Sequence, residues 1–167
     1  GEKPGTFICP FDMSKISYLL TLDSDTELPI DGAIELLSAA MHPENMPVLK
    51  DGRVVSGYGI FQPAVRTRLA DSTRTYHALF GSRSSGGYER ASYDRYQTLL
   101  GSGVFCGKGL IDIELFEKLA LSAVPDGIIL SHDVIEGGLL RTLLVSDCTF
   151  SDSTPKNSIS CFRRQHR

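Results

Sequence analysis

The sequence predicts an α/β fold in a single domain of 167 residues. Two observations indicate this class. Short apolar runs of strand length alternate along the chain with segments whose apolar residues recur at helical spacing, and glycine or proline often separates them. The hydrophobic content of 41% and the charged content of 22% are typical of a globular domain with a real core.

The first part of the chain predicts one strand and one helix. Residues 1–15 are rich in turn formers and indicate no regular element, whereas the apolar run at 16–22 predicts a buried strand. A helix is predicted over 31–41, because Asp31 can cap it and the apolar residues that follow recur at helical spacing: Ile34, Leu37 and Met41. The pair His42-Pro43 ends this helix.

The middle of the chain alternates in the same way. Asp51-Gly52 is a hairpin-type turn signal, and the strand-like run 54–61 follows it. A helix is predicted over 70–80. The serine- and glycine-rich segment 81–88 is either a solvated connector, the preferred interpretation, or a mobile flap over a site.

The last part of the chain predicts two strands and two helices. Residues 101–109 are punctuated by glycine, and Val104-Phe105-Cys106 within them predicts a short strand before a tight turn. The patterns at 112–121 and 131–140 predict helices, the second with Ser131 as a candidate cap and Gly137-Gly138 weakening its end. A final strand is predicted over 143–148.

Composition excludes several classes of function. A net charge of −3 gives no reason to expect nucleic acid or an anionic membrane as the main partner. No apolar run approaches the roughly 18 to 20 residues of a membrane span, and no signal peptide is recognised. Four cysteines without a C-x-x-C pair favour free thiols over disulfides: Cys9, Cys106, Cys148 and Cys161. A soluble, intracellular segment is therefore expected.

The most informative motif is Asp23-Ser24-Asp25, directly after the run 16–22. If the strand geometry persists, residues two apart share a face, so both carboxylates point the same way. Two close carboxylates repel each other unless a cation or a proton lies between them. A divalent cation carrying phosphate oxygens suits such a pair. The alternative interpretation is a surface turn with no chemical role.

Two further clusters carry candidate chemistry. Asp133 opens the predicted helix 131–140, where helix amides and the helix dipole stabilise a carboxylate, and it is either a helix-start residue or a general base for a hydroxyl. The basic segment 163–167 is either a frayed end or a cationic clamp for a diphosphate. Gly107-Lys108-Gly109 lacks the spacing of a P-loop, and we reject that interpretation.

The order of these motifs resembles a GT-A glycosyltransferase of the family-2 type. Longer strings are similar to the glycosyltransferase domain of cyclic β-1,2-glucan synthases (glycosyltransferase family 84). They are Leu20-Thr21-Leu22-Asp23-Ser24-Asp25-Thr26-x-Leu28-Pro29, Val55-x-Gly57-Tyr58-Gly59-Ile60-x-Gln62-Pro63, Gly107-Lys108-Gly109 and Leu130-Ser131-His132-Asp133-x-x-Glu136-Gly137. The resemblance covers residues 18–167 and implies a partial GT-A (Rossmann-like nucleotide-diphospho-sugar transferase) fold, with a mixed sheet flanked by helices.

The resemblance also implies roles for individual residues. Asp23 and Asp25 match the D-x-D motif that holds Mg²⁺ or Mn²⁺ on the diphosphate of UDP-glucose. Asp133 matches the acid that deprotonates the acceptor hydroxyl. Arg164 and Arg167 match part of the Q/R-x-x-R-W region near the leaving diphosphate, although the tryptophan of that pattern is not in this chain.

On this resemblance the expected activity is inverting transfer of glucose from UDP-glucose to a β-1,2-glucan acceptor. Only 22 residues precede Asp23, so we expect residues 1–167 to be a portion of a GT-A domain in a larger multidomain protein, at the cytoplasmic face of the inner membrane and in contact with the remaining domains. The chain alone is then expected to be weak or inactive.

Two alternatives stay open. A haloacid-dehalogenase-like phosphatase uses a D-x-D-x-[TV] motif after a strand, with Asp23 as nucleophile and Asp25 as acid, but here Glu27 stands where that pattern has Thr or Val. A GT-A-like scaffold fragment without catalysis is the second.

Overall fold

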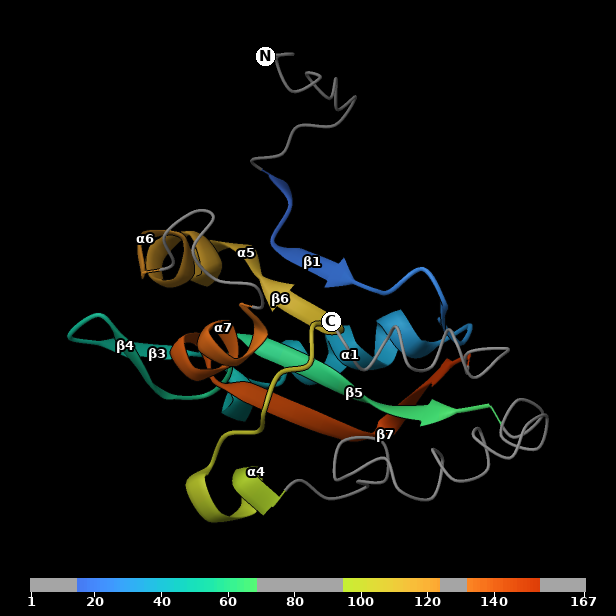
Figure 1. Ribbon diagram of the computed structural model, residues 1–167. Helices are drawn as coiled ribbons and strands as arrows, with labels where there is room; N and C mark the ends of the chain where they lie inside the picture. The colour runs from blue at the N-terminus through green and yellow to red at the C-terminus, as the bar shows by residue number, and fades with distance from the viewer. Residues whose placement is uncertain (1–14, 69–94, 124–131, 154–167) are drawn as a thin grey trace, which may run out of the picture.

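The computed structural model describes residues 15–68, 95–123 and 132–153. They form a mixed five-stranded sheet with helices on both faces, together with a separate two-stranded hairpin (Figure 1). The predicted α/β class with a mixed sheet is thus confirmed. The sheet strands are β1 (Tyr18–Thr21), β2 (Thr26–Glu27), β5 (Ile60–Thr67), β6 (Gly109–Asp112) and β7 (Thr142–Asp152), and the hairpin strands are β3 (Val48–Lys50) and β4 (Arg53–Ser56).

The strand order in the sheet is β1-β6-β5-β7-β2. Strands β5 and β7 are parallel, and every other neighbouring pair is antiparallel. The register of β5 against β7 shifts between Pro63 and Ala64, which pair with Val145 and Thr149. Because proline has no N–H to donate, a break in the ladder is expected there. The ladder between these two central strands is therefore interrupted at Pro63.

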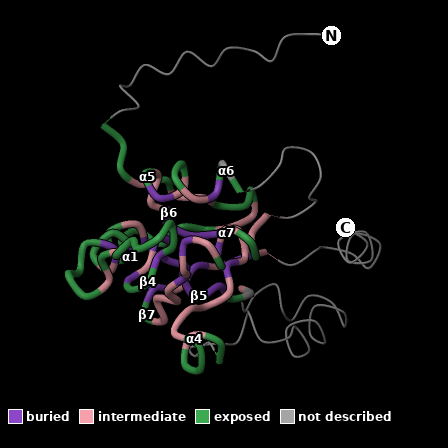
Figure 2. Tube along the Cα trace, turned by 90° about the vertical axis from the view of Figure 1, so that its left-hand side faces the viewer, coloured by how far each residue is buried: buried purple, intermediate pink, exposed green. Residues whose placement is uncertain are grey.

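Each face of the sheet has its own hydrophobic core. Ile60 and Ile111 point to a core completed by α5 (Ile113–Leu115), the π-helical η3 (Phe116–Ala120) and α7 (Asp133–Leu140). Their neighbours Phe61 and Leu110 point to the other core, beneath α1 (Gly32–Ala40). This alternation follows from the two-residue repeat of a strand. Figure 2 shows the buried residues gathered along the strands and where the helices contact them.

Helix α1 forms where it was predicted, but its buried face is different. The pattern had indicated Ile34, Leu37 and Met41 as the apolar stripe, yet all three are exposed, Ile34 to 64%. The buried positions are instead Gly32, Leu36 and Ala40. A Cβ built on Gly32 would lie 2.7 Å from Cε1 of Phe150, so the close contact with the sheet requires glycine at this position. Asp31 occupies the cap position without a side-chain cap hydrogen bond.

The predicted strand 54–61 is divided in two. Gly57 has φ +70°, a conformation that favours glycine, and a Cβ there would overlap the backbone of Met46. The chain turns at this point, so that β4 belongs to the hairpin and β5 to the main sheet. The hairpin turn itself is confirmed, with positive φ at both Asp51 and Gly52, the pattern of a type I′ turn.

The other predicted strands need correction as well. The strand predicted over 16–22 is shorter, Tyr18–Thr21, and lies at the sheet edge with Leu19 52% exposed instead of being buried. Residues 104–106 form no strand, and the strand of this region is β6. The last strand, predicted over 143–148, extends from Thr142 to Asp152.

The two later helices are confirmed with adjusted bounds. The helix predicted over 112–121 is built from α5, η3 and α6 (Leu121–Ala123), and Asp112 caps it by accepting a hydrogen bond from the Leu115 N–H at 3.0 Å. The helix predicted over 131–140 begins at Asp133. A short helix α4 (Arg95–Leu100) and the 3₁₀ turn η2 (Pro43–Asn45) were not predicted.

Several predictions fall outside the described residues. They are the helix over 70–80, the segment 81–88, the cap Ser131, the basic segment 163–167 with Arg164 and Arg167, and the thiols Cys9 and Cys161. Of the other two cysteines, both Cys106 and Cys148 are free thiols. In the described part of the chain, no helix has the length and apolar character that crossing a membrane requires.

Candidate functional site

The D-x-D motif lies on a tight turn. Strand β1 ends at Thr21, and the Thr26 N–H donates to the Asp23 carbonyl at 3.1 Å, which closes a β-turn over 23–26. The strand geometry therefore does not continue through Asp23 and Asp25. The two carboxylates are placed by the turn and not by a shared face of a strand. The Asp23 side chain is 55% exposed, whereas Asp25 is half-buried.

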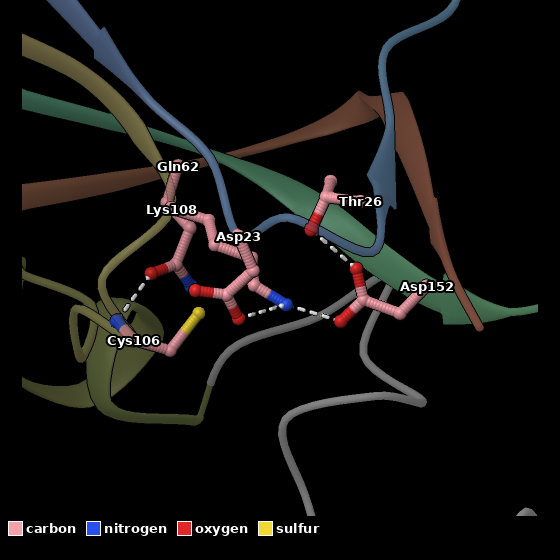
Figure 3. Close-up of polar contacts among 6 residues, drawn as sticks. All are labelled: Asp23, Thr26, Gln62, Cys106, Lys108 and Asp152. Carbon is pink, nitrogen blue, oxygen red and sulfur yellow. Dashed lines mark hydrogen bonds and ion pairs between the residues drawn. The ribbon is translucent and has the colours of Figure 1, made fainter. Parts of the chain in front are cut away.

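A buried lysine meets this turn. Lys108 extends its ammonium group to two carboxylates, the Oδ2 atoms of Asp152 and, at 3.0 Å, of Asp23 (Figure 3). Its side chain is only 7% exposed. Gly107 and Gly109 on either side have φ +85° and +151°, and a Cβ on Gly109 would lie 2.5 Å from the Phe61 carbonyl oxygen. These glycines let the chain turn sharply before β6 and bring Lys108 inward.

Asp152 holds the far side of this contact. It is buried at the end of β7, and its Oδ1 accepts a hydrogen bond from the Thr26 hydroxyl at 2.6 Å while its Oδ2 receives Lys108. Both carboxylate oxygens therefore have donors, as a buried charge requires. The hydrogen bond between Thr26 and Asp152 joins the start of β2 to the end of β7, and the same two residues are also partners in the ladder between these strands.

A second buried polar side chain fixes the approach to Lys108. Gln62 on β5 is buried, and its Oε1 accepts a hydrogen bond from the Cys106 N–H at 2.8 Å (Figure 3). The segment Cys106-Gly107-Lys108, which we call the 106–108 turn, is thus tied to the sheet at one end and to two carboxylates at the other. Both anchors are tertiary contacts, so the geometry of the turn depends on the packed fold.

Asp133 lies against the same turn. It is the first residue of α7, after an N-cap at His132 whose side chain makes no cap hydrogen bond. A Cβ built on Gly107 would be 3.2 Å from Oδ2 of Asp133, so the carboxylate packs directly over this glycine. The 106–108 turn therefore has Asp133 beside its glycine and Asp23 at its lysine. The three motif regions of the sequence that the structure describes lie around one turn.

The local electrostatics agree with this arrangement. Burial lowers the pKa of Lys108, but its hydrogen bonds and charge interactions with Asp152 and Asp23 outweigh burial and leave that pKa raised. Burial raises the pKa of the Cys106 thiol; the backbone and charge of Lys108 oppose this, and the charges of Asp133 and Asp152 add to it. The pKa of Glu136 is raised by burial and by the Asp133 charge. The site is a concentration of carboxylates around one ammonium.

Helix α7 is held at its other end by Arg141. This residue has φ +60°, a strained value for a residue with a side chain, and its guanidinium donates to the Gly101 carbonyl at 2.6 Å and the Val55 carbonyl at 3.1 Å. The guanidinium also lies over the Tyr58 ring, 5.5 Å from its centroid. The position of Asp133 is thereby set by contacts at both ends of its helix.

An open groove of about 430 Å³ runs beside α7. It has apolar and aromatic walls, and neither Asp23, Asp133 nor Lys108 lines it. Its lining residues are Val54, Tyr96, Leu100, Ser102, Gly103, Val104, Phe105, Val134, Gly137, Gly138 and Arg141.

Few side chains near Asp23 could hold a divalent cation. Within 15–68, 95–123 and 132–153, no group of three or more His, Cys, Asp and Glu side chains is arranged to hold a metal ion. Asp23 nevertheless offers exposed carboxylate oxygens, and pairing with Lys108 through Oδ2 does not exhaust its roughly four acceptor positions. Mg²⁺ is commonly held by one or two carboxylates together with substrate phosphates and waters. The β-turn over 23–26 is therefore compatible with an Mg²⁺ ion that also binds substrate phosphates.

Sequence reasoning missed three residues of this cluster. Lys108 was considered in a P-loop, which was rejected, and within a string of the family resemblance, but it was given no role of its own, and neither were Gln62 and Asp152. A signal existed for Lys108, because a lysine between two glycines indicates a sharp turn that can bury an otherwise surface-seeking side chain. No local pattern identifies Asp152, because its partners, Thr26 and Lys108, are distant in sequence.

The chain is 34% identical, over its whole length, to the cyclic beta-(1,2)-glucan synthase NdvB of Rhizobium meliloti (strain 1021). The two sequences are related. The match spans 6% of the length of NdvB, so the chain corresponds to a small part of that protein. No protein-family profile matches the chain. The similarity to NdvB relates the chain to a glucan synthase and agrees with the predicted relationship to cyclic β-1,2-glucan synthases.

Proposed function

We propose that this chain is a portion of an inverting glucosyltransferase that transfers glucose from UDP-glucose to a hydroxyl of a β-1,2-glucan. The observation that carries the proposal is the 106–108 turn, which has the carboxylates of Asp23 and Asp133 on two sides. A transferase of this kind needs a base for the acceptor and positive charge near the leaving diphosphate. The similarity to a glucan synthase supports the choice of reaction.

Asp133 is the proposed base. In the proposed reaction the acceptor oxygen forms a bond to the anomeric carbon, while the bond from that carbon to the diphosphate oxygen breaks and UDP leaves with the electron pair. The acceptor proton passes to a carboxylate oxygen of Asp133. The single displacement inverts the anomeric centre, and no protein nucleophile is needed. Asp133 lies at the start of α7, against Gly107 of the 106–108 turn.

Asp23 and Asp25 are the proposed carboxylates for a divalent cation on the donor diphosphate. Such a cation, when bound, would stabilise negative charge on the leaving group. The exposed Asp23 carboxylate faces solvent, where a diphosphate can reach it. Arg164 and Arg167 lie outside the described residues and remain predicted contacts of the leaving group.

The proposal is tested in the full-length protein that carries this chain, by measuring glucosyl transfer from UDP-glucose to a glucan acceptor. Asp133→Asn should keep donor binding and lose turnover, since it removes only the base. Asp23→Ala and Asp25→Ala should abolish metal-dependent transfer. Glu114→Gln, on the exposed side of α5, is the matched control and should behave as wild type.

Turnover by Asp133→Asn equal to wild type would refute the base assignment. Phosphate release from an aryl phosphate, without any requirement for a sugar nucleotide, would instead favour the phosphatase alternative. Wild-type transfer by all three aspartate variants would mean that the segment is a non-catalytic scaffold.

A further inference from the structure

Lys108 has two unequal carboxylate partners. Asp152 is buried and is also held by the Thr26 hydroxyl, whereas the Asp23 side chain is more than half exposed on its turn. The lysine side chain, 7% exposed, runs through the protein to reach both. The contact with Asp152 is therefore the fixed one, and the contact with Asp23 is the one that solvent, ions and ligands can reach.

We propose that Lys108 competes with a divalent cation for the Asp23 carboxylate, and thereby makes cation binding depend on the donor diphosphate. The inference rests on the proposed function and names a positioning residue for it. The ammonium already neutralises part of the negative charge that would attract a cation. A divalent cation on the same carboxylate would come within several Å of the ammonium, and the two positive charges would repel each other.

A bound diphosphate would offset the repulsion between the Lys108 ammonium and a divalent cation. Its oxygens carry negative charge that both the ammonium and the divalent cation attract, so the repulsion between the two cations is offset when all three are together. Cation and diphosphate should therefore bind with positive cooperativity, and thermodynamic linkage requires that each strengthens the other by the same factor. Asp23 then binds a divalent cation tightly only when the donor diphosphate is present.

Calorimetric titration of the full chain with Mn²⁺, alone and with saturating UDP, tests this directly. Lys108→Met should bind Mn²⁺ alone about tenfold more tightly than wild type, on the scale expected for removing one positive charge beside a carboxylate that solvent still screens. The strengthening of Mn²⁺ binding by UDP should be smaller in Lys108→Met than in wild type. Lys108→Arg keeps the charge and should resemble wild type. Lys118→Met, which removes an exposed ammonium paired with Glu114, is the matched control and should change neither quantity.

Removing Lys108 alone leaves the buried Asp152 without its cation, which can prevent folding. The double variant Lys108→Met/Asp152→Asn removes both charges and keeps an oxygen that accepts from Thr26. It should unfold cooperatively on heating and also bind Mn²⁺ alone more tightly than wild type. Adding Asp23→Asn to it should remove that gain.

Two results would overturn the inference. One is a folded double variant that binds Mn²⁺ no more tightly than wild type, including the case in which neither binds it. The other is Mn²⁺ binding that UDP strengthens equally in wild type and Lys108→Met. Neither result depends on glucosyl transfer, so a loss of transfer in Asp133→Asn would still support the proposed function if this inference failed.

Discussion

Two adjacent glycines in α7 should respond oppositely to the same substitution. A Cβ on Gly137 would lie 2.8 Å from the Phe105 Cβ, 3.0 Å from the Thr142 Oγ1 and 3.1 Å from the Phe105 nitrogen, whereas a Cβ on Gly138 has no atom within 4 Å. Both glycines are helical, so alanine gains about 0.5–1 kcal/mol of helix propensity at either position. Gly138→Ala should therefore raise the free energy of unfolding by about that amount.

Gly137→Ala should lower the free energy of unfolding despite the same gain. The contacts at 2.8 Å and 3.1 Å involve the Cβ and the backbone nitrogen of Phe105, which cannot rotate away, so α7 must shift from the segment that leads into the 106–108 turn. Forcing extra atoms into packed surroundings costs about 1–3 kcal/mol. Because the propensity gain is common to both variants, the difference between them measures this cost alone.

Urea denaturation of wild type and the two variants, followed by circular dichroism, provides the comparison. Equal stability of Gly137→Ala and Gly138→Ala would refute the close packing of α7 on Phe105. It would also show that α7 accepts a Cβ at its buried face without shifting from the segment that leads into the 106–108 turn.

Two further predictions concern buried groups. Gln62→Ala removes the oxygen that accepts from the Cys106 N–H, so the free energy of unfolding should fall by about 1–3 kcal/mol in urea denaturation; an unchanged midpoint would show that Gln62 does not anchor the 106–108 turn. Burial, together with the hydrogen bond and charge of Glu35, raises the pKa of Cys148 to about 12, whereas an unfolded thiol ionises near about 8.5. Its contribution to stability should thus be complete below about pH 8.5 and be lost as pH rises toward the folded value, so Cys148→Ala should flatten the alkaline fall in unfolding free energy, and parallel curves would contradict this.

Local sequence signals were sufficient for the class of fold and for most elements. The helix with Asp133, the hairpin turn at Asp51-Gly52 and the last strand from its start to Cys148 are each indicated by residues close in sequence. Local signals failed where tertiary contacts decide. At position 32 the Phe150 side chain leaves no room for a Cβ, so Gly32 faces the sheet together with Leu36 and Ala40, and Ile34 is exposed.

Two of the carboxylates around the 106–108 turn, Asp23 and Asp133, were predicted as site residues from their motifs, whereas Asp152 and the geometry of the site were not. A tight turn after Cys106 was predicted as well, but the buried Lys108 that pairs with Asp23 was not. A lysine that pairs with carboxylates from two other segments leaves no periodic pattern, because its burial is offset only by contacts that exist after folding. Gln62 was not predicted for the same reason, because its partner, the Cys106 N–H, belongs to a segment distant in sequence.

The central claim is that the donor nucleotide binds at the 106–108 turn, between Asp23 and Asp133. Titration of the isotopically labelled full chain with UDP-glucose and Mg²⁺, followed through its backbone amide NMR signals, tests this most directly. The account predicts that the largest shifts occur at Asp23, Gly107, Lys108 and Asp133. Shifts confined to the groove at Tyr96, Leu100 and Val134, with these four residues unchanged, would contradict it.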